Sequence, residues 1–127
     1  MKRIIWIFIL FTSLASCGQT NKESELFGRE QAEEELKTAL NNMKLHNVID
    51  NKTIIIQDSS TAIKVAELIL SNIYGIDNIQ KQKPYKSYLI KNYWVISGTL
   101  SEDYAGGVFL IIIDATNSEV IRITHGK

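Results

Sequence analysis

The apolar positions of this chain repeat first with the period of helices and later with that of strands. Between residues 29 and 45 they recur every three or four positions, which places Ala32, Leu36, Leu40 and Met43 on one side of a helix. Glutamates gather in its first turns, where they favour the helix dipole. We therefore predict an amphipathic helix here, and we interpret the acidic run as its solvated face.

A second helix is predicted at residues 60–74. Asp58, Ser59 and Ser60 supply side-chain oxygens that can cap its first backbone N–H groups. Gly75 follows the last apolar residues and is typical of a helix end. The helix would bury a stripe formed by Ala62, Ala66, Ile69 and Ile73, widened by Ile63, Val65 and Leu70.

Short apolar runs predict the strands. A β-branched run at residues 53–57 predicts a short strand before the second helix. After a polar loop at 76–84, strands are expected at 85–90, 93–100, 108–114 and 119–125. Their short turns require antiparallel pairing. The order predicts an α+β domain, with two helices followed by a curved antiparallel four-strand meander and packed on one of its faces.

The parity within these strands predicts which residues face the core. Trp94, Ile96 and Leu100 share one side of their strand. The run at 108–113 is apolar on both sides, as expected for a central strand covered on both faces. Gly98 predicts a bend in the sheet, and the pair Gly106 and Gly107 predicts a hairpin in which glycine permits positive φ.

The N-terminus has the pattern of a bacterial export signal. Lys2 and Arg3 precede an apolar run at residues 4–14. A helix of that length spans about 16 Å, well short of the roughly 30 Å hydrocarbon core. The following residues, Leu14 to Cys17, resemble a lipobox. This resemblance implies a signal peptide at 1–16, diacylation of Cys17, and a cell-envelope protein held on a bacterial membrane by that lipid.

Composition excludes several classes of partner. The chain has 14 basic and 14 acidic residues, and removal of residues 1–16 takes away Lys2 and Arg3, so no basic excess remains to bind nucleic acid. Residues 17–28 are polar and aperiodic and predict a flexible tether to a single domain at 29–127. Cys17 is the one cysteine and the histidines have no metal-ligand spacing, so neither a metal nor a cofactor is expected.

The second half of the chain resembles the bacterial nuclear transport factor 2 fold immunity proteins. The resemblance lies in segments 61–67, 73–75, 82–85, 93–100, 106–109 and 121–127, which occur in the family's order. It implies a helix-filled, strongly curved antiparallel sheet of the nuclear transport factor 2-like or cystatin-like kind. It also implies a binding protein, not an enzyme, that neutralises a toxin of a bacterial polymorphic toxin system.

Two sets of residues are candidates for a functional site. Tyrosine is enriched in protein interfaces, and four tyrosines lie near the expected edges and turns of the sheet: Tyr85, Tyr88, Tyr93 and Tyr104. The alternative is a small-ligand site or an enzyme using a cone-shaped pocket, because Asp114 and His125 are the best available acid–base couple. A further alternative is an envelope structural or assembly lipoprotein without a dedicated ligand.

Overall fold

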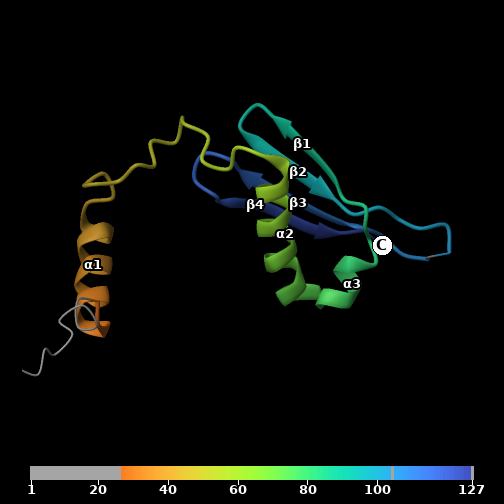
Figure 1. Cartoon of the computed structure of the whole chain (residues 1–127), viewed down its shortest axis with the longest axis horizontal. Helices are drawn as coiled ribbons and strands as arrows, with labels where there is room; N and C mark the ends of the chain where they lie inside the picture. The colour runs from red at the N-terminus through yellow and green to blue at the C-terminus, as the bar shows by residue number, and fades with distance from the viewer. Residues whose placement is uncertain (1–26, 104, 127) are drawn as a thin grey trace, which may run out of the picture. The chain divides into compact units, whose positions relative to one another are not determined.

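The structure, a computed structural model, describes residues 27–103 and 105–126. The predicted signal peptide at 1–16, Cys17 and nearly all of the tether lie outside these residues. The chain divides into two compact units between Leu45 and His46. The first contains α1 (Arg29–Asn41), and the second contains α2 (Ser59–Tyr74), α3 (Ile76–Gln80), β1 (Lys86–Ile90), β2 (Tyr93–Ser97), β3 (Phe109–Asp114) and β4 (Val120–His125) (Figure 1).

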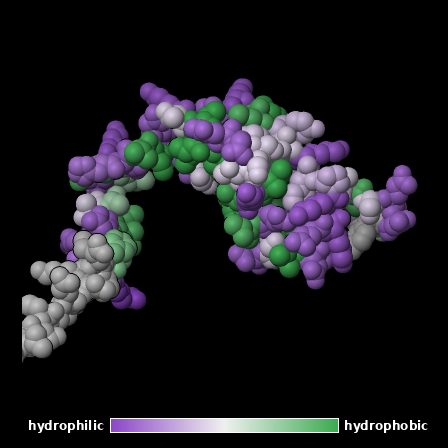
Figure 2. All heavy atoms as spheres, viewed as in Figure 1, coloured by the Kyte–Doolittle hydropathy of each residue, from purple (hydrophilic) through white to green (hydrophobic). Residues whose placement is uncertain are grey.

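The first predicted helix is present as α1, which ends at Asn41. None of its residues is buried, and Figure 2 shows hydrophobic residues exposed along it. Its N-cap, Gly28, has no side chain with which to bind the first N–H groups. Because the division between the two units falls after Leu45, α1 is described by itself, and the single domain at 29–127 stays a prediction.

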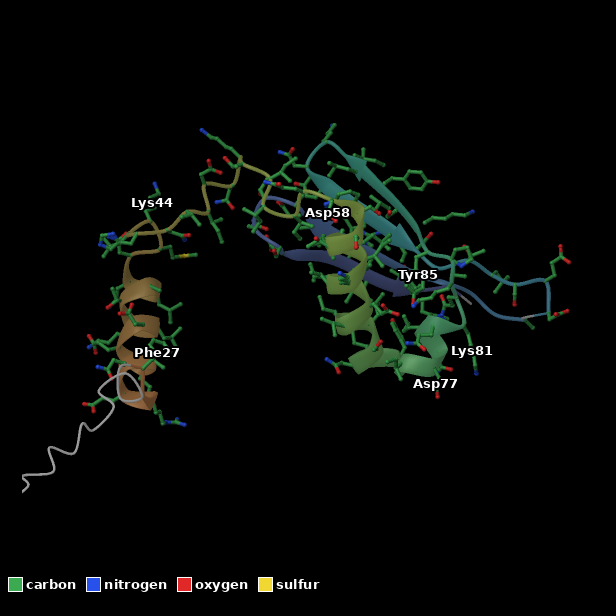
Figure 3. All side chains as sticks on the ribbon, viewed as in Figure 1. Phe27, Lys44, Asp58, Asp77, Lys81 and Tyr85 are labelled. Atoms are coloured by element: carbon green, nitrogen blue, oxygen red, sulfur yellow. The ribbon has the colours of Figure 1, made fainter. Side chains whose placement is uncertain are left out.

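The second predicted helix is confirmed as α2. The Asp58 carboxylate accepts hydrogen bonds from the Thr61 N–H and hydroxyl, both at 2.8 Å (Asp58 is labelled in Figure 3). At the other end Gly75 has a φ of 85°, and its N–H donates to the Ser71 carbonyl. The buried residues are Ala62, Ala66 and Leu70, whereas Ile73, expected in the stripe, is exposed.

Two predicted elements differ from the structure. Residues 53–57 form no strand, because the N–H groups of Ile55 and Ile56 both donate to one acceptor, the Ala115 carbonyl, and do not form a ladder. The expected loop at 76–84 begins with the short helix α3, whose Ile79 is fully buried. A buried apolar residue in a polar segment gives no periodic signal, so the sequence did not reveal this helix.

The four-strand antiparallel meander is confirmed, with strand order β1-β2-β3-β4. β2 ends at Ser97, earlier than expected, and Leu100, predicted to face the core, is exposed. The β3–β4 pairing shifts register between Ile112 and Ile113, which marks a bulge. The molecule therefore has the α+β architecture predicted for the nuclear transport factor 2-like class.

The core lies between α2 and one face of the sheet, which α2 crosses in Figure 1. The indole N–H of Trp94 donates to the Ile56 carbonyl at 2.9 Å, which ties residues 53–57 to the sheet. Phe109, Ile111 and Ile113 of β3 are buried, but the alternate residues Leu110 and Ile112 are only half-buried. The prediction that this strand is covered on both faces is therefore wrong within the described residues.

Candidate functional site

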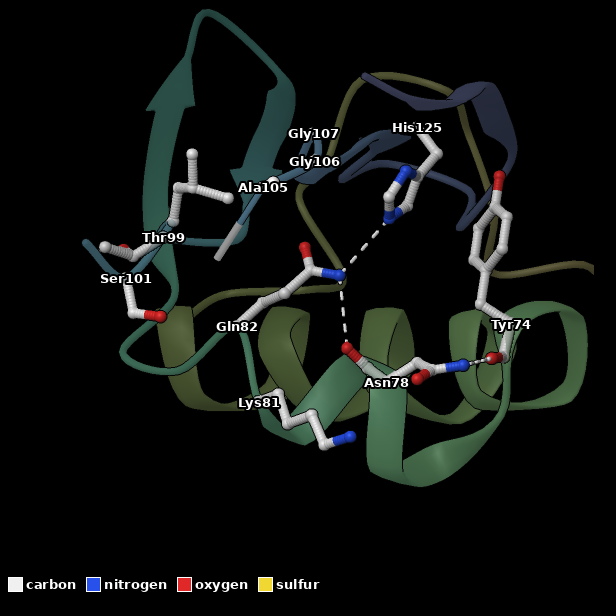
Figure 4. Close-up of a pocket in the computed structure, with 11 residues that line it drawn as sticks. Tyr74, Asn78, Lys81, Gln82, Thr99, Ser101, Ala105, Gly106, Gly107 and His125 are labelled. Carbon is white, nitrogen blue, oxygen red and sulfur yellow. Dashed lines mark hydrogen bonds between the residues drawn. The ribbon is translucent and has the colours of Figure 1, made fainter. Parts of the chain in front are cut away.

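A pocket of about 390 Å³ opens where β4 ends, between α3 and the loop that follows β2 (Figure 4). Its wall combines three parts of the chain that are far apart in sequence. Its lining consists of Tyr74, Asn78, Lys81, Gln82, Thr99, Leu100, Ser101, Ala105, Gly106, Gly107 and His125. This pocket contains His125, one of the two residues predicted for a ligand site.

Gln82 joins the walls of the pocket. Its Oε1 accepts a hydrogen bond from the backbone N–H of Phe109 at 2.8 Å. Its Nε2 donates to the Asn78 carbonyl at 3.1 Å and lies 3.3 Å from His125 Nε2 (Figure 4). The donor at Phe109 and the acceptor at Asn78 together determine which end of the amide is oxygen and which is nitrogen.

This orientation of the amide determines the role of each nitrogen in His125. Since Gln82 presents an N–H, the Nε2 of His125 accepts the hydrogen bond. The proton of a neutral ring is then on Nδ1, which lies 3.0 Å from the Gly126 carbonyl and donates to it. The ring also contacts Tyr74, with centroids 5.2 Å apart. Both nitrogens thus have partners within the chain, which leaves neither as a ready general base.

The structure does not bring Asp114 and His125 together. His125 is the register partner of Phe109 at the start of β3, whereas Asp114 is the last residue of that strand. At the rise of an antiparallel strand, the two positions are roughly 17 Å apart. The Asp114 carboxylate instead accepts hydrogen bonds from the N–H and hydroxyl of Thr116, at 2.8 and 2.6 Å. The predicted acid–base couple is therefore wrong, and Asp114 stabilises the β3–β4 turn.

Two glycines allow the chain to close around the pocket. A Cβ on Gly98 would lie 2.7 Å from the Cβ of Gln82, so a side chain there would displace the glutamine. A Cβ on Gly107 would collide with the backbone of Gly126. Gly98 therefore permits a close approach of Gln82, and Gly107 serves backbone packing, while Gly106 has the positive φ expected of the pair.

The four predicted tyrosines have different surroundings. Tyr85 is half-buried against Phe109, and its hydroxyl donates to Glu67 and to the Ile79 carbonyl, both at 3.1 Å (Figure 3 labels Tyr85 beside α3). Burial, and then its hydrogen bond with Glu67, raise the pKa of that hydroxyl. Tyr104 lies outside the described residues. Tyr88 and Tyr93 remain exposed, so they are the pair available to a partner.

Tyr88 and Tyr93 belong to the face of the sheet opposite the core. Trp94 and Ile96 point into the core, so their neighbours on β2 point away from it. Residues paired directly across neighbouring strands share a face, so the register identifies the residues of the other three strands that lie on the same side as Tyr93. We define the outer face as Lys86, Tyr88, Ile90, Tyr93, Val95, Ser97, Leu110, Ile112, Asp114, Arg122 and Thr124.

Within residues 27–103 and 105–126, no group of three or more histidine, aspartate, glutamate or cysteine side chains is placed to hold a metal ion. In the same residues, no helix has the length and apolar character needed to cross a membrane. The pocket at the end of β4 and the outer face are the two candidate sites that contain residues singled out from the sequence.

Comparison with known proteins identifies the family. The model of the NTF2 fold immunity proteins matches residues 61–127, which extend from the first turn of α2 to the end of the chain. The chain belongs to this family. The match includes α2, α3, all four strands, the pocket and the outer face, and this confirms the family that the sequence segments predicted.

Two curated relatives of this chain come from Escherichia coli strain K12. The protein YhhH is 34% identical over 84 residues, which cover 65% of this chain and 61% of YhhH. The protein YbbC is 29% identical over 121 residues, which cover 94% of this chain and 90% of YbbC. Both are described as uncharacterised. No solved structure shows significant similarity to the chain.

Proposed function

We propose that this chain is a lipid-anchored immunity protein that binds and neutralises a toxin of a bacterial polymorphic toxin system, without catalysing a reaction. The observation that carries the proposal is the family match over residues 61–127. That segment contains the complete sheet and the helix that covers it. The segment that matches the family therefore includes the described strands of the second unit, α3, and α2 from Thr61 onward, and with them the surfaces that could bind a toxin.

The geometry of the pocket favours binding over catalysis. Asp114 and His125 lie at opposite ends of β3, and both nitrogens of His125 have partners within the chain. The Gln82 amide is likewise engaged by Phe109 and Asn78. The Gln82 amide holds the segment after α3 against the start of β3 and the end of β4, and the enzymatic alternative loses the couple on which it depended.

Protection of cells tests the neutralising function. The full-length chain is expressed in sensitive bacteria, which are then challenged in turn with neighbours that each deliver one polymorphic toxin of the strain from which the chain comes. We expect survival to rise by at least tenfold over cells that carry an empty vector. Equal killing in both cultures would reject the immunity function, and covalent crosslinking to envelope assembly proteins alone would favour a structural lipoprotein instead.

Substitution Cys17→Ser tests the anchor. We expect the wild-type chain to sediment with membranes, with a mass that shows removal of residues 1–16 and acylation of Cys17. The variant has no thiol to acylate, so it should stay out of the membrane fraction. Substitution Ser13→Ala provides a matched control in the same segment. An intact N-terminus or an unmodified Cys17 in the wild-type protein would contradict the proposed anchor.

A further inference from the structure

We propose that the outer face of the sheet is the surface that binds the toxin, and that the toxin presents there an apolar patch bordered by carboxylates. This inference rests on the proposed function, because it names the surface and the chemistry of that same partner. It follows from three features of the described residues. The outer face has an exposed aromatic and aliphatic centre, it has cations on both edge strands, and it differs in charge from the groove between α2 and α3.

The centre of the outer face is apolar and aromatic. Tyr88, Ile90 and Tyr93 are 59%, 55% and 39% exposed. Tyr93 is paired with Ile90, and Tyr88 is paired with Val95. Ile112, which is half-buried, continues the Tyr88 row onto β3. Contiguous apolar residues on a rigid sheet, with tyrosines that bury a large area at low entropic cost, are typical of protein interfaces.

Cations lie on both edge strands of the outer face. Lys86 is exposed on β1, and Arg122 is exposed on β4, so they lie on opposite edge strands. Arg122 ends the row that contains Tyr88, Val95 and Ile112. Neither cation has an ion pair among the described residues, where the pairs join Arg29, Lys37 and Lys83 to glutamates.

The one carboxylate on the outer face is already engaged. Asp114 uses its Oδ1 to accept both hydrogen bonds from Thr116, the residue that begins the turn to β4. The face therefore presents two cations without ion pairs and one carboxylate that is hydrogen-bonded within the turn, a net charge of +1 around an apolar centre. A partner that places carboxylates opposite Lys86 and Arg122 would satisfy both charges, and complementary charges also raise the rate of association.

The groove between α2 and α3 is a weaker candidate. It is lined by Lys64, Glu67, Leu68, Ser71, Asn72, Ile76 and Gln80. Its one carboxylate is engaged within the chain, since Glu67 pairs with Lys83 at 3.1 Å and also binds the hydroxyl of Tyr85, so Lys64 is its single cation without an ion pair among the described residues. The groove therefore has one unpaired cation, whereas the outer face has one on each edge strand, and its residues supply matched control positions on the opposite side of the second unit.

Four single substitutions test the outer face in the full-length chain. Tyr88→Ala removes an aromatic side chain from the centre, and Arg122→Glu reverses a cation at the edge. The controls are Leu68→Ala and Lys64→Glu, which make the same kinds of change at exposed positions of α2. Circular dichroism and thermal unfolding establish that each variant retains the fold of the wild-type chain.

Affinity is measured by calorimetry with the purified toxin whose killing the wild-type chain suppresses. We expect Tyr88→Ala and Arg122→Glu each to weaken binding by about tenfold or more, and the two α2 controls by less than about threefold. Rising ionic strength should weaken wild-type binding more than binding of Arg122→Glu, because salt screens the charge that the variant lacks. Protection of cells should fall in the same order.

The possible failures are distinguishable. Absence of protection by the wild-type chain rejects the proposed function and this inference with it. Protection that is unchanged in both outer-face variants overturns the inference alone. The inference is also overturned if sedimentation shows a wild-type dimer that Tyr88→Ala dissociates while toxin affinity is unchanged. Binding to phosphatidylserine vesicles that Arg122→Glu abolishes, with toxin affinity unchanged, likewise assigns the face to another occupant.

Discussion

Gln82 shows how a single side chain can hold together segments that are distant in sequence. Its amide satisfies the Phe109 N–H at the start of β3, the Asn78 carbonyl of α3 and a nitrogen of His125. Its backbone carbonyl accepts from the Thr99 N–H at 2.7 Å. The sequence around it is a run of polar residues with no period, so reasoning from pattern identified His125 and missed the residue that positions it.

Gln82→Ala should destabilise the second unit by about 1–3 kcal/mol, because it leaves the N–H of the buried Phe109 without an acceptor. Urea unfolding monitored by Trp94 fluorescence measures the effect. Gln82→Glu is the control: it retains the acceptor and loses the donor to Asn78, so it should cost less than the alanine variant. Equal losses in the two variants would contradict the importance of the Phe109 hydrogen bond.

Asp58 links stability to pH. Hydrogen bonds from the Thr61 N–H, and then from the Thr61 hydroxyl, lower the pKa of the Asp58 carboxyl below its usual value. A lowered folded-state pKa means that this stabilisation is complete above about pH 4 and is lost as the pH falls. Asp58→Asn keeps a cap but cannot titrate, so its thermal midpoint should fall less than that of wild type on acidification.

The control for this measurement is Asp50→Asn. Hydrogen bonds from Thr53 and Lys52 lower the pKa of Asp50 to about 2, so Asp50 contributes a second loss of stability in acid. Each single variant should therefore keep part of the acid sensitivity, and the double variant should show the least. Thermal midpoints that fall in parallel for wild type and Asp58→Asn from pH 6 to pH 2.5 would rule out the role of the cap.

At the scale of elements, contacts decided what local pattern left open. The run at residues 53–57 has the composition of a strand, yet the ends of the sheet offer it one carbonyl at Ala115 and the indole N–H of Trp94. It therefore packs as a loop. The end of β4 closes on the chain before β3, where the Gly126 N–H donates to the Val108 carbonyl and Gly107 lies against Gly126.

Gly107→Ala should destabilise this closure by about 1–3 kcal/mol, because the new methyl group would meet the backbone of Gly126, which cannot rotate away as a side chain would. Chemical unfolding gives the loss, and amide exchange at Gly126 localises it. Ser101→Ala, at an exposed position of the same loop, should leave stability within about 0.5 kcal/mol of wild type. A neutral Gly107→Ala variant would show that the strand ends separate at little cost.

At the scale of the whole molecule, stability is distributed unevenly between the two units. The second unit has a core of buried residues contributed by α2, α3 and the sheet. In the first unit, α1 contains 13 residues, none of them buried, and its N-cap makes no side-chain hydrogen bond. A helix of this length is marginal in water without tertiary packing.

Hydrogen exchange should therefore separate the units in the unbound full-length protein. We expect the amides of α1 to exchange within seconds at neutral pH, whereas those of β3 and the buried side of α2 should be protected by at least about a thousandfold more, since their opening approaches global unfolding. The exposed strand β1 serves as an internal reference of intermediate protection. Equal protection of α1 and β3 would mean that α1 is stabilised by contacts beyond its own turns.

The sequence by itself determined the elements whose signals are local. Periodicity, Asp58 and Gly75 delimit α2, and short turns require the meander that the structure contains, because these effects act over a few neighbouring residues. Tertiary structure alone decided the rest. It put Asp114 and His125 at opposite ends of β3, gave Tyr85 and Gln82 internal partners, and gathered Tyr88, Tyr93 and Arg122 on one face. Alternation gave the faces of single strands, but which residues of different strands and helices meet depends on pairing and packing between segments distant in sequence.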